Sequence, residues 1–103
     1  MANINATIRA RIVTPETPTI YNVLVLSANT EFSQLLSDST KRFTIKVRDA
    51  AKLQIAYLPG ESGTNFLTIP RGAVYTEDNM SFSGTLYFQA DKAGVTVEIV
   101  QWV

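Results

Sequence analysis

The closing stretch of the chain, residues 95–103 (VTVEIVQWV), decides the fold class. Successive side chains of a β-strand point to opposite faces, and here both faces are apolar. Val100 and Trp102 lie on one face, and three branched residues lie on the other: Val95, Val97 and Ile99. The stretch therefore predicts either a central strand of a β-sandwich or a strand that a neighbouring subunit covers.

The same period of two recurs upstream. Residues 4–12 alternate apolar with polar side chains, which predicts a long half-buried strand. Residues 19–27 (TIYNVLVLS) are β-branched and become apolar on both faces. No segment has a convincing helical pattern, because the window 27–39 is too rich in Ser and Thr for more than one turn. The predicted strands are 4–12, 19–27, 42–48, 53–58, 66–69, 85–90 and 95–103.

Turn residues separate these short strands, for example Pro-Gly at 59–60 and Lys-Ala-Gly at 92–94. About seven or eight short strands with polar turns are typical of a β-sandwich or a small barrel. We expect an all-β, single-domain antiparallel β-sandwich over residues 1–103, with jelly-roll-like topology. Residues 1–18 are expected to form an N-terminal strand or arm that is available for subunit contacts.

The composition favours a folded protein that buries surface against other subunits. Of the 103 residues, 46% are hydrophobic and only 17% are charged, which argues against disorder. The formal net charge is zero, so no overall field attracts nucleic acid or an anionic membrane. The N-terminus lacks the pattern of a secretory signal, and the longest apolar run, Val23–Leu26, is far short of a membrane span.

The chain contains neither cysteine nor histidine. Their absence excludes Ser-His and Cys-His catalysis, disulfides, and metal sites built on thiolate or imidazole. The adjacent acids Glu77 and Asp78 could bind calcium in a loop, but no spacing typical of a calcium loop surrounds them, so a solvated turn is the favoured interpretation. We therefore predict a protein that is not an enzyme and has no catalytic residue, cofactor or metal site.

Residues 58–65 (LPGESGTN) contain the glycines and hydroxyl groups of a possible phosphate loop or serine turn. A phosphate loop needs a lysine after its last glycine and a helix after that. A catalytic serine elbow needs Gly-x-Ser-x-Gly and a histidine. Neither pattern is present, so the stretch predicts a hairpin loop whose glycines supply positive φ angles.

Basic residues gather on one predicted strand, residues 41–49 (KRFTIKVRD), where Arg42, Lys46 and Arg48 share the polar face. They could face an anion or an acidic protein surface, but pairing across neighbouring strands is the favoured interpretation. Residues 1–52 carry seven basic and four acidic side chains, hence plus three, and residues 53–103 carry two basic and five acidic ones, hence minus three. The two halves are thus electrostatically complementary. The candidate interface residues are Val100, Trp102, Val103, Arg42, Lys46 and Arg48.

Three blocks of the sequence resemble small β-structured virion proteins of tailed bacteriophages. They are Asn-Thr-Glu-aromatic-Ser-Gln at 29–34, Leu-Thr-Ile-Pro-x-Gly-x-x-Tyr at 67–75, and Leu-Tyr-Phe-Gln…Val-Glu-Ile-x-x-Trp at 86–102. The resemblance implies a capsid decoration or cement protein, a head-fibre base, or a small tail or neck subunit. Such proteins are commonly jelly-roll-like and often trimeric at capsid three-fold positions.

From this resemblance we expect a homotrimer that is made in the host cytoplasm and binds the major capsid protein, or another virion protein, at the capsid surface. No nucleic acid or membrane partner is expected. The alternative is a glycan-binding module, a lectin or phage adhesin, in which Tyr57, Phe66 and Tyr75 form a sugar platform beside the 59–65 loop.

Overall fold

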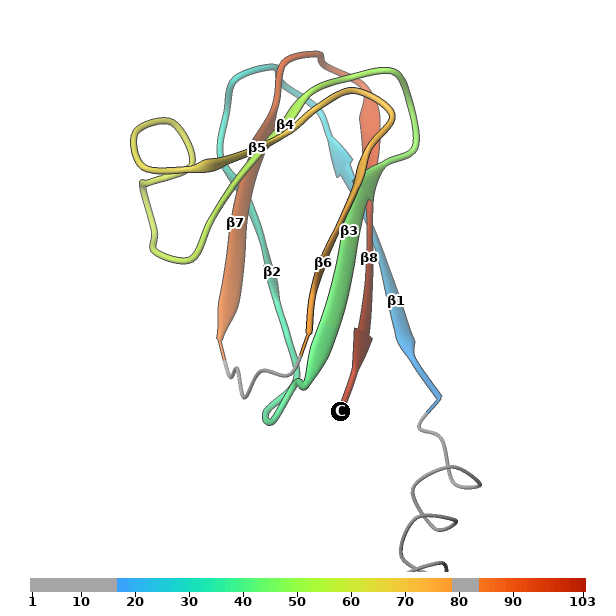
Figure 1. The fold of residues 1–103 in the computed structure, drawn as a ribbon. Helices are drawn as coiled ribbons and strands as arrows, with labels where there is room; N and C mark the ends of the chain where they lie inside the picture. The colour runs from blue at the N-terminus through green and yellow to red at the C-terminus, as the bar shows by residue number, and fades with distance from the viewer. Residues whose placement is uncertain (1–16, 79–83) are drawn as a thin grey trace, which may run out of the picture.

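The computed structural model describes residues 17–78 and 84–103 (Figure 1). Eight strands and no helix occur in these two ranges. The strands are β1 (Thr19–Val25), β2 (Phe32–Leu35), β3 (Arg42–Val47), β4 (Leu53–Ala56), β5 (Leu67–Ile69), β6 (Val74–Glu77), β7 (Thr85–Ala90) and β8 (Val95–Trp102).

The strands form two four-stranded sheets that pack face to face. One sheet has the order β1-β8-β3-β6, the other has the order β2-β7-β4-β5, and every neighbouring pair is antiparallel. The chain crosses between the sheets after β1, β2, β3, β5, β6 and β7, which is the wrapping of a jelly roll. The predicted all-β, jelly-roll-like antiparallel sandwich is confirmed, and a closed barrel is excluded.

Two strands were missing from the sequence prediction. β2 lies inside the window 27–39, and β6 lies in a stretch to which no strand was assigned. Both lie at the edge of a sheet and contain no buried residue, so neither has the apolar alternation that would mark it in the sequence. The predicted strand 4–12 lies outside the described residues, and so does most of the expected arm 1–18.

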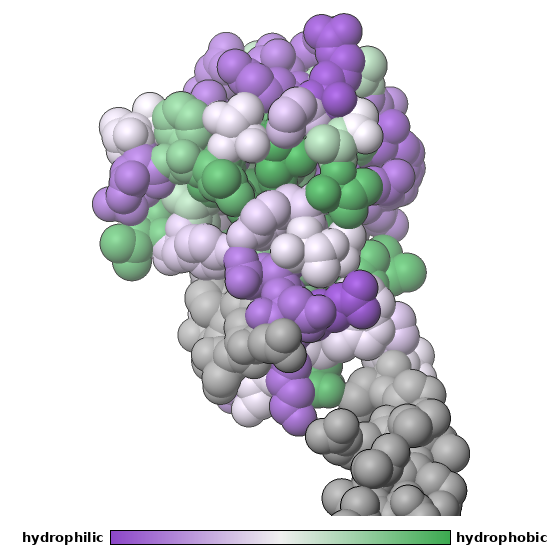
Figure 2. All heavy atoms as spheres, viewed as in Figure 1, coloured by the Kyte–Doolittle hydropathy of each residue, from purple (hydrophilic) through white to green (hydrophobic). Residues whose placement is uncertain are grey.

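Exposed hydrophobic side chains occur on the edge strands β5 and β6 and on the loop before β5 (Figure 2). Between 39% and 58% of their surface is accessible to solvent. They are Leu58, Phe66, Leu67 and Val74. The composition led us to expect that another protein covers part of the surface. These side chains add to the apolar area available for such a contact.

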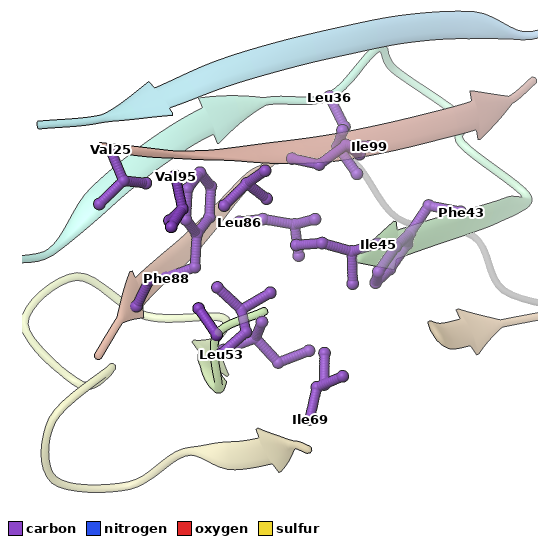
Figure 3. Close-up of a cluster of buried hydrophobic side chains, with 14 residues drawn as sticks. Val25, Leu36, Phe43, Ile45, Leu53, Ile69, Leu86, Phe88, Val95 and Ile99 are labelled. Carbon is purple, nitrogen blue, oxygen red and sulfur yellow. The ribbon is translucent and has the colours of Figure 1, made fainter. Parts of the chain in front are cut away.

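The core lies between the inner faces of the two sheets (Figure 3). Its largest fully buried side chains are Phe43 on β3 and Phe88 on β7. β8 lies between β1 and β3 and contributes three residues to this core, namely Val95, Val97 and Ile99. The closing stretch is therefore a central strand, as its two apolar faces predicted, and its other face is the surface considered next.

Candidate protein interface

The outward side chains of the β1-β8-β3-β6 sheet form one continuous surface, which we call the β8 face. The strand register places Ile20, Val100 and Thr44 in one row across it, and Asn22, Glu98 and Lys46 in the next. Five of the six predicted interface residues come together on the β8 face, from β8, β3 and the residue that follows β3. They are Val100, Trp102, Arg42, Lys46 and Arg48. Val103, just after β8, is 39% exposed.

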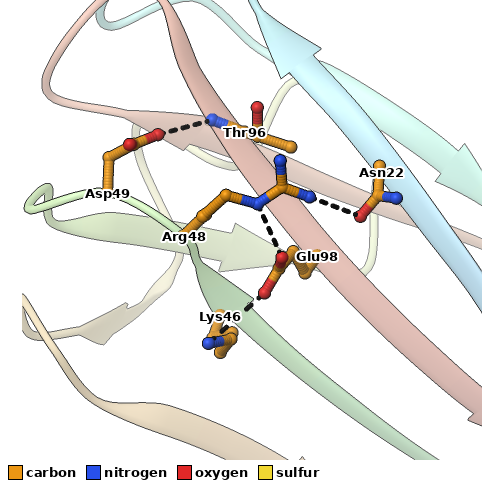
Figure 4. Close-up of polar contacts among 6 residues, drawn as sticks. All are labelled: Asn22, Lys46, Arg48, Asp49, Thr96 and Glu98. Carbon is orange, nitrogen blue, oxygen red and sulfur yellow. Dashed lines mark hydrogen bonds and ion pairs between the residues drawn. The ribbon is translucent and has the colours of Figure 1, made fainter.

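Glu98 lies at the centre of a polar cluster on the β8 face (Figure 4). Its Oε2 accepts a hydrogen bond from Arg48 Nε at 2.7 Å, and its Oε1 is 3.3 Å from Lys46 Nζ. Arg48 also donates through Nη2 to Asn22 Oδ1 at 3.3 Å. The hydrogen bond from Arg48, assisted by Lys46, holds the pKa of Glu98 below its ordinary value.

The basic side chains predicted to share the polar face of strand 41–49 therefore contact other residues of the same sheet. Lys46 and Arg48 share the carboxylate of Glu98, and the guanidinium of Arg42 lies 4.6 Å from the centre of the Trp102 ring, a cation–π contact. Cross-strand pairing was the favoured interpretation of this stripe, and the contacts agree with it. The plus-three and minus-three halves of the sequence meet here, because β3 and β8 belong to different halves and pair directly.

The sequence analysis missed the contribution of β1 to this face. Ile20 is 63% exposed and Leu24 is 52% exposed, and their register places them beside β8. The alternation in TIYNVLVLS predicted a strand but not which of its apolar faces is open. Only the pairing of β1 with β8 shows that Tyr21 and Val23 turn inward and that Ile20 and Leu24 turn outward.

The aromatic residues of the predicted sugar platform have different surroundings. Tyr57 and Phe66 are about equally exposed, at 40% and 39%. Tyr75 is half-buried, with its ring centre 6.2 Å from that of Phe43 and its hydroxyl donating to Glu77. That hydrogen bond to a carboxylate, together with burial and Tyr57, raises the pKa of Tyr75 far above its ordinary value. Tyr75 is thus a packed residue, and only two exposed rings are left for a platform.

The 58–65 loop joins β4 to β5, which pair antiparallel, so the predicted hairpin loop is confirmed. Gly60 has a φ of 81°, as expected, but Gly63 does not have a positive φ. A Cβ at Gly63 would lie 3.2 Å from Gln89 Oε1, so that glycine permits close packing on β7 instead.

A carboxylate from a distant part of the chain holds this loop. Glu31 accepts hydrogen bonds from the backbone N–H of Gly60 at 2.8 Å, from that of Ser62 at 3.1 Å and from the Ser62 hydroxyl at 2.6 Å. Ser62 is 1% exposed and also lies 3.2 Å from Gln89 Oε1. Burial raises the pKa of Glu31, but these three hydrogen bonds outweigh burial and hold it below its ordinary value. The serine is therefore a structural residue of the loop.

The remaining polar surface of the described residues includes one depression. This shallow depression of about 460 Å³ beside β3 is lined by Lys46, Arg48 and Arg71, together with Asp49. No group of three or more potential metal-ligating side chains occurs within 17–78 and 84–103. The same residues include no helix long and apolar enough to cross a membrane. What the described surface offers is area for contact with another protein.

No protein-family model, curated protein or solved structure matches this chain. The resemblance of residues 29–34, 67–75 and 86–102 to phage virion proteins thus stays an interpretation of the sequence.

Proposed function

We propose that this protein is a structural subunit of a bacteriophage virion: a homotrimer that decorates and cements the capsid by binding the major capsid protein. One observation carries the proposal. The β8 face presents the apolar side chains of Ile20, Leu24 and Val100 beside Lys46 and Arg48, which share the single carboxylate of Glu98. A partner that covers this face is expected to supply a carboxylate for the remaining positive charge, because an unpaired buried charge would cost about 3–5 kcal/mol.

Two further properties support a structural role. The jelly-roll architecture is common among viral capsid domains, which is an argument by analogy of fold. The chain lacks cysteine and histidine, and the exposed hydrophobic side chains lie on broad surfaces. Virion subunits act by contacts repeated many times over a shell, and such contacts need area and shape complementarity.

The proposed mechanism is mass action. A protein that binds the assembled shell, but not the free capsid subunits, stabilises the shell in proportion to the logarithm of its concentration over its dissociation constant. In a trimer, every contact after the first becomes intramolecular, so the apparent affinity rises without any new contact. No bond is made or broken.

The test uses phage capsids that lack the protein, to which purified protein is added back. Val100→Glu places a charge on the β8 face, and Thr68→Glu places the same charge on the outward side of the other sheet. We expect the original protein and Thr68→Glu to bind and to raise the temperature at which the capsids release DNA, and Val100→Glu to do neither. Circular dichroism checks that both variants are folded.

Three results would contradict parts of the proposal. If capsids that lack the protein resist heat, low ionic strength and chelation as well as complete ones do, there is no cementing. Equal binding of Val100→Glu and Thr68→Glu would exclude the β8 face. Light scattering that finds one chain per particle at high concentration would exclude the trimer.

The exposure of Tyr57 and Phe66 beside the 59–65 loop favours one second candidate, a glycan-binding module. A glycan array decides it. Binding that is lost in Phe66→Ala, with the capsid effect absent, would replace the structural proposal. An array without hits would exclude this second candidate.

A further inference from the structure

β1 is an unusually open edge strand. It is the outermost strand of its sheet, it pairs with β8 on one side, and no other strand within 17–78 and 84–103 pairs with its other side (Figure 1). It has seven residues, whereas the other edge strands β2, β5 and β6 have four, three and four. Residues 17–30 contain no charged side chain. Proteins usually protect such edges with charges, proline or short length, because an open edge pairs with other strands.

The register shows which backbone groups of β1 are open. Arg48 N–H donates to Thr96 O at 2.8 Å, so these two residues form a hydrogen-bonded pair, and the even-numbered residues of β8 bond to β3. The odd-numbered residues of β8 therefore bond to the odd-numbered residues of β1. It follows that the N–H and C=O groups of Ile20, Asn22 and Leu24 point to the open edge.

We propose that β1 pairs antiparallel with β1 of a second copy of this chain, with Asn22 opposite Asn22 of the second copy. In this register Ile20 lies opposite Leu24 of the second copy, and Leu24 lies opposite its Ile20. All three pairs join residues whose backbone groups are open, so each pair exchanges two main-chain hydrogen bonds. The two sheets become one continuous eight-stranded sheet.

The side chains favour a second β1 as the occupant. Ile20 and Leu24 are 63% and 52% exposed in the single chain, and in the paired strands each covers the other on the joined β8 faces. The two Asn22 side chains meet at the symmetry axis as uncharged groups. Residues 17–30 carry no charge of their own, and the Arg48 guanidinium that reaches Asn22 is paired with Glu98, which limits repulsion between the two copies. Main-chain pairing therefore supplies the hydrogen bonds, and Ile20 and Leu24 supply the apolar area.

This contact goes beyond the proposed function. It relates two copies by a two-fold axis, whereas a trimer is closed by a three-fold axis. The β1 pairing therefore joins two single chains or two trimers, and the particles in solution contain an even number of chains. Failure of the pairing leaves capsid binding untouched, and failure of capsid binding leaves the pairing untouched.

Cysteine cross-linking tests the register, because the chain contains no cysteine of its own. In Asn22→Cys the two new residues are a directly opposed pair with Cα atoms roughly 5.5 Å apart, which a disulfide can span. In the control Ile20→Cys the two cysteines are four residues apart along the paired strands, roughly 13 Å, which no disulfide spans. We expect mild oxidation of the full-length protein to cross-link Asn22→Cys at least tenfold faster than Ile20→Cys.

Asn22→Pro provides a second test. The N–H of Asn22 points away from β8, so proline removes an edge hydrogen-bond donor and spares the pairing between β1 and β8. We expect light scattering to find an even number of chains for the original protein and half that number for Asn22→Pro, with circular dichroism unchanged. Equal cross-linking rates of the two cysteine variants would overturn the proposal. An odd number of chains per particle would also overturn it, and is the result expected if another protein or the N-terminal segment covers β1. If Asn22→Pro does not fold, the cysteine comparison decides alone.

Discussion

At the scale of single residues, Glu31 has the clearest role among the ionisable groups. Its carboxylate accepts three hydrogen bonds from the 58–65 loop, which is about thirty residues away in sequence. A carboxylate that accepts several hydrogen bonds satisfies donors that the loop itself leaves without partners. Glu31 therefore fixes the position of the loop over β7.

We predict that Glu31→Ala lowers the free energy of unfolding by about 1–3 kcal/mol, the cost of leaving the buried N–H of Ser62 unpaired. The Ser62 hydroxyl can turn to Gln89 and the exposed N–H of Gly60 can bond to water, but the Ser62 N–H loses its acceptor. Urea unfolding measures the change. The control is Glu61→Ala, which removes another carboxylate of the same loop and is expected to cost less than about 0.5 kcal/mol. Equal losses in the two variants would contradict the assigned role of Glu31.

The same contact predicts a dependence on pH. The pKa of Glu31 in the folded protein lies below its ordinary value of 4.5, so its stabilisation is complete well above pH 4.5 and is lost as the pH falls through the folded-state pKa. We expect the difference in unfolding free energy between the original protein and Glu31→Ala to shrink steadily below pH 4.5. Urea unfolding at a series of pH values measures it, and a difference that stays constant down to pH 3 would be evidence against the prediction. Glu98 also has a lowered pKa, but it is present in both proteins, so its pH-dependent contribution to the free energy of unfolding cancels in the difference.

At the scale of elements, β8 organises the molecule. Its inner face supplies Val95, Val97 and Ile99 to the core, and Gln101 extends that face to the loop after β2. The Gln101 side chain accepts from the Ser37 backbone N–H at 2.9 Å and donates to the Ser37 hydroxyl at 2.6 Å. A buried amide is acceptable only with such partners. One strand thus holds two neighbouring strands, the core and a distant loop together.

The two faces of β8 predict different costs of truncation. Ile99→Ala leaves a cavity among fully buried neighbours and is expected to lower the free energy of unfolding by about 2–5 kcal/mol. Val100→Ala, one residue along and on the outward face, is expected to cost less than about 1 kcal/mol. Urea unfolding at concentrations where the protein does not associate makes the comparison. A cost for Val100→Ala as large as that for Ile99→Ala would mean that the strand register is wrong.

At the scale of the whole molecule, strands distant in sequence become neighbours. β8, the last strand, lies between β1 and β3, and Lys46 meets Glu98 from the other half of the chain. The fold class and the long strands β1, β3, β7 and β8 could be predicted from alternation, because period two is a local property. The edge strands β2 and β6 could not, because neither contains a buried residue that would produce an apolar alternation, and their place depends on partners elsewhere.

By itself the sequence determined that this protein is all-β, that its last strand is apolar on both faces, and that no chemistry based on cysteine or histidine is available. Those conclusions follow from composition and local period. Only the tertiary structure decided that Lys46 and Arg48 are paired with Glu98, that Glu31 holds the 58–65 loop, and that no strand within 17–78 and 84–103 pairs with the outer edge of β1. Each of these depends on which strands lie side by side. Strand pairing is set by the packing of the whole core, and no single stretch of sequence contains it.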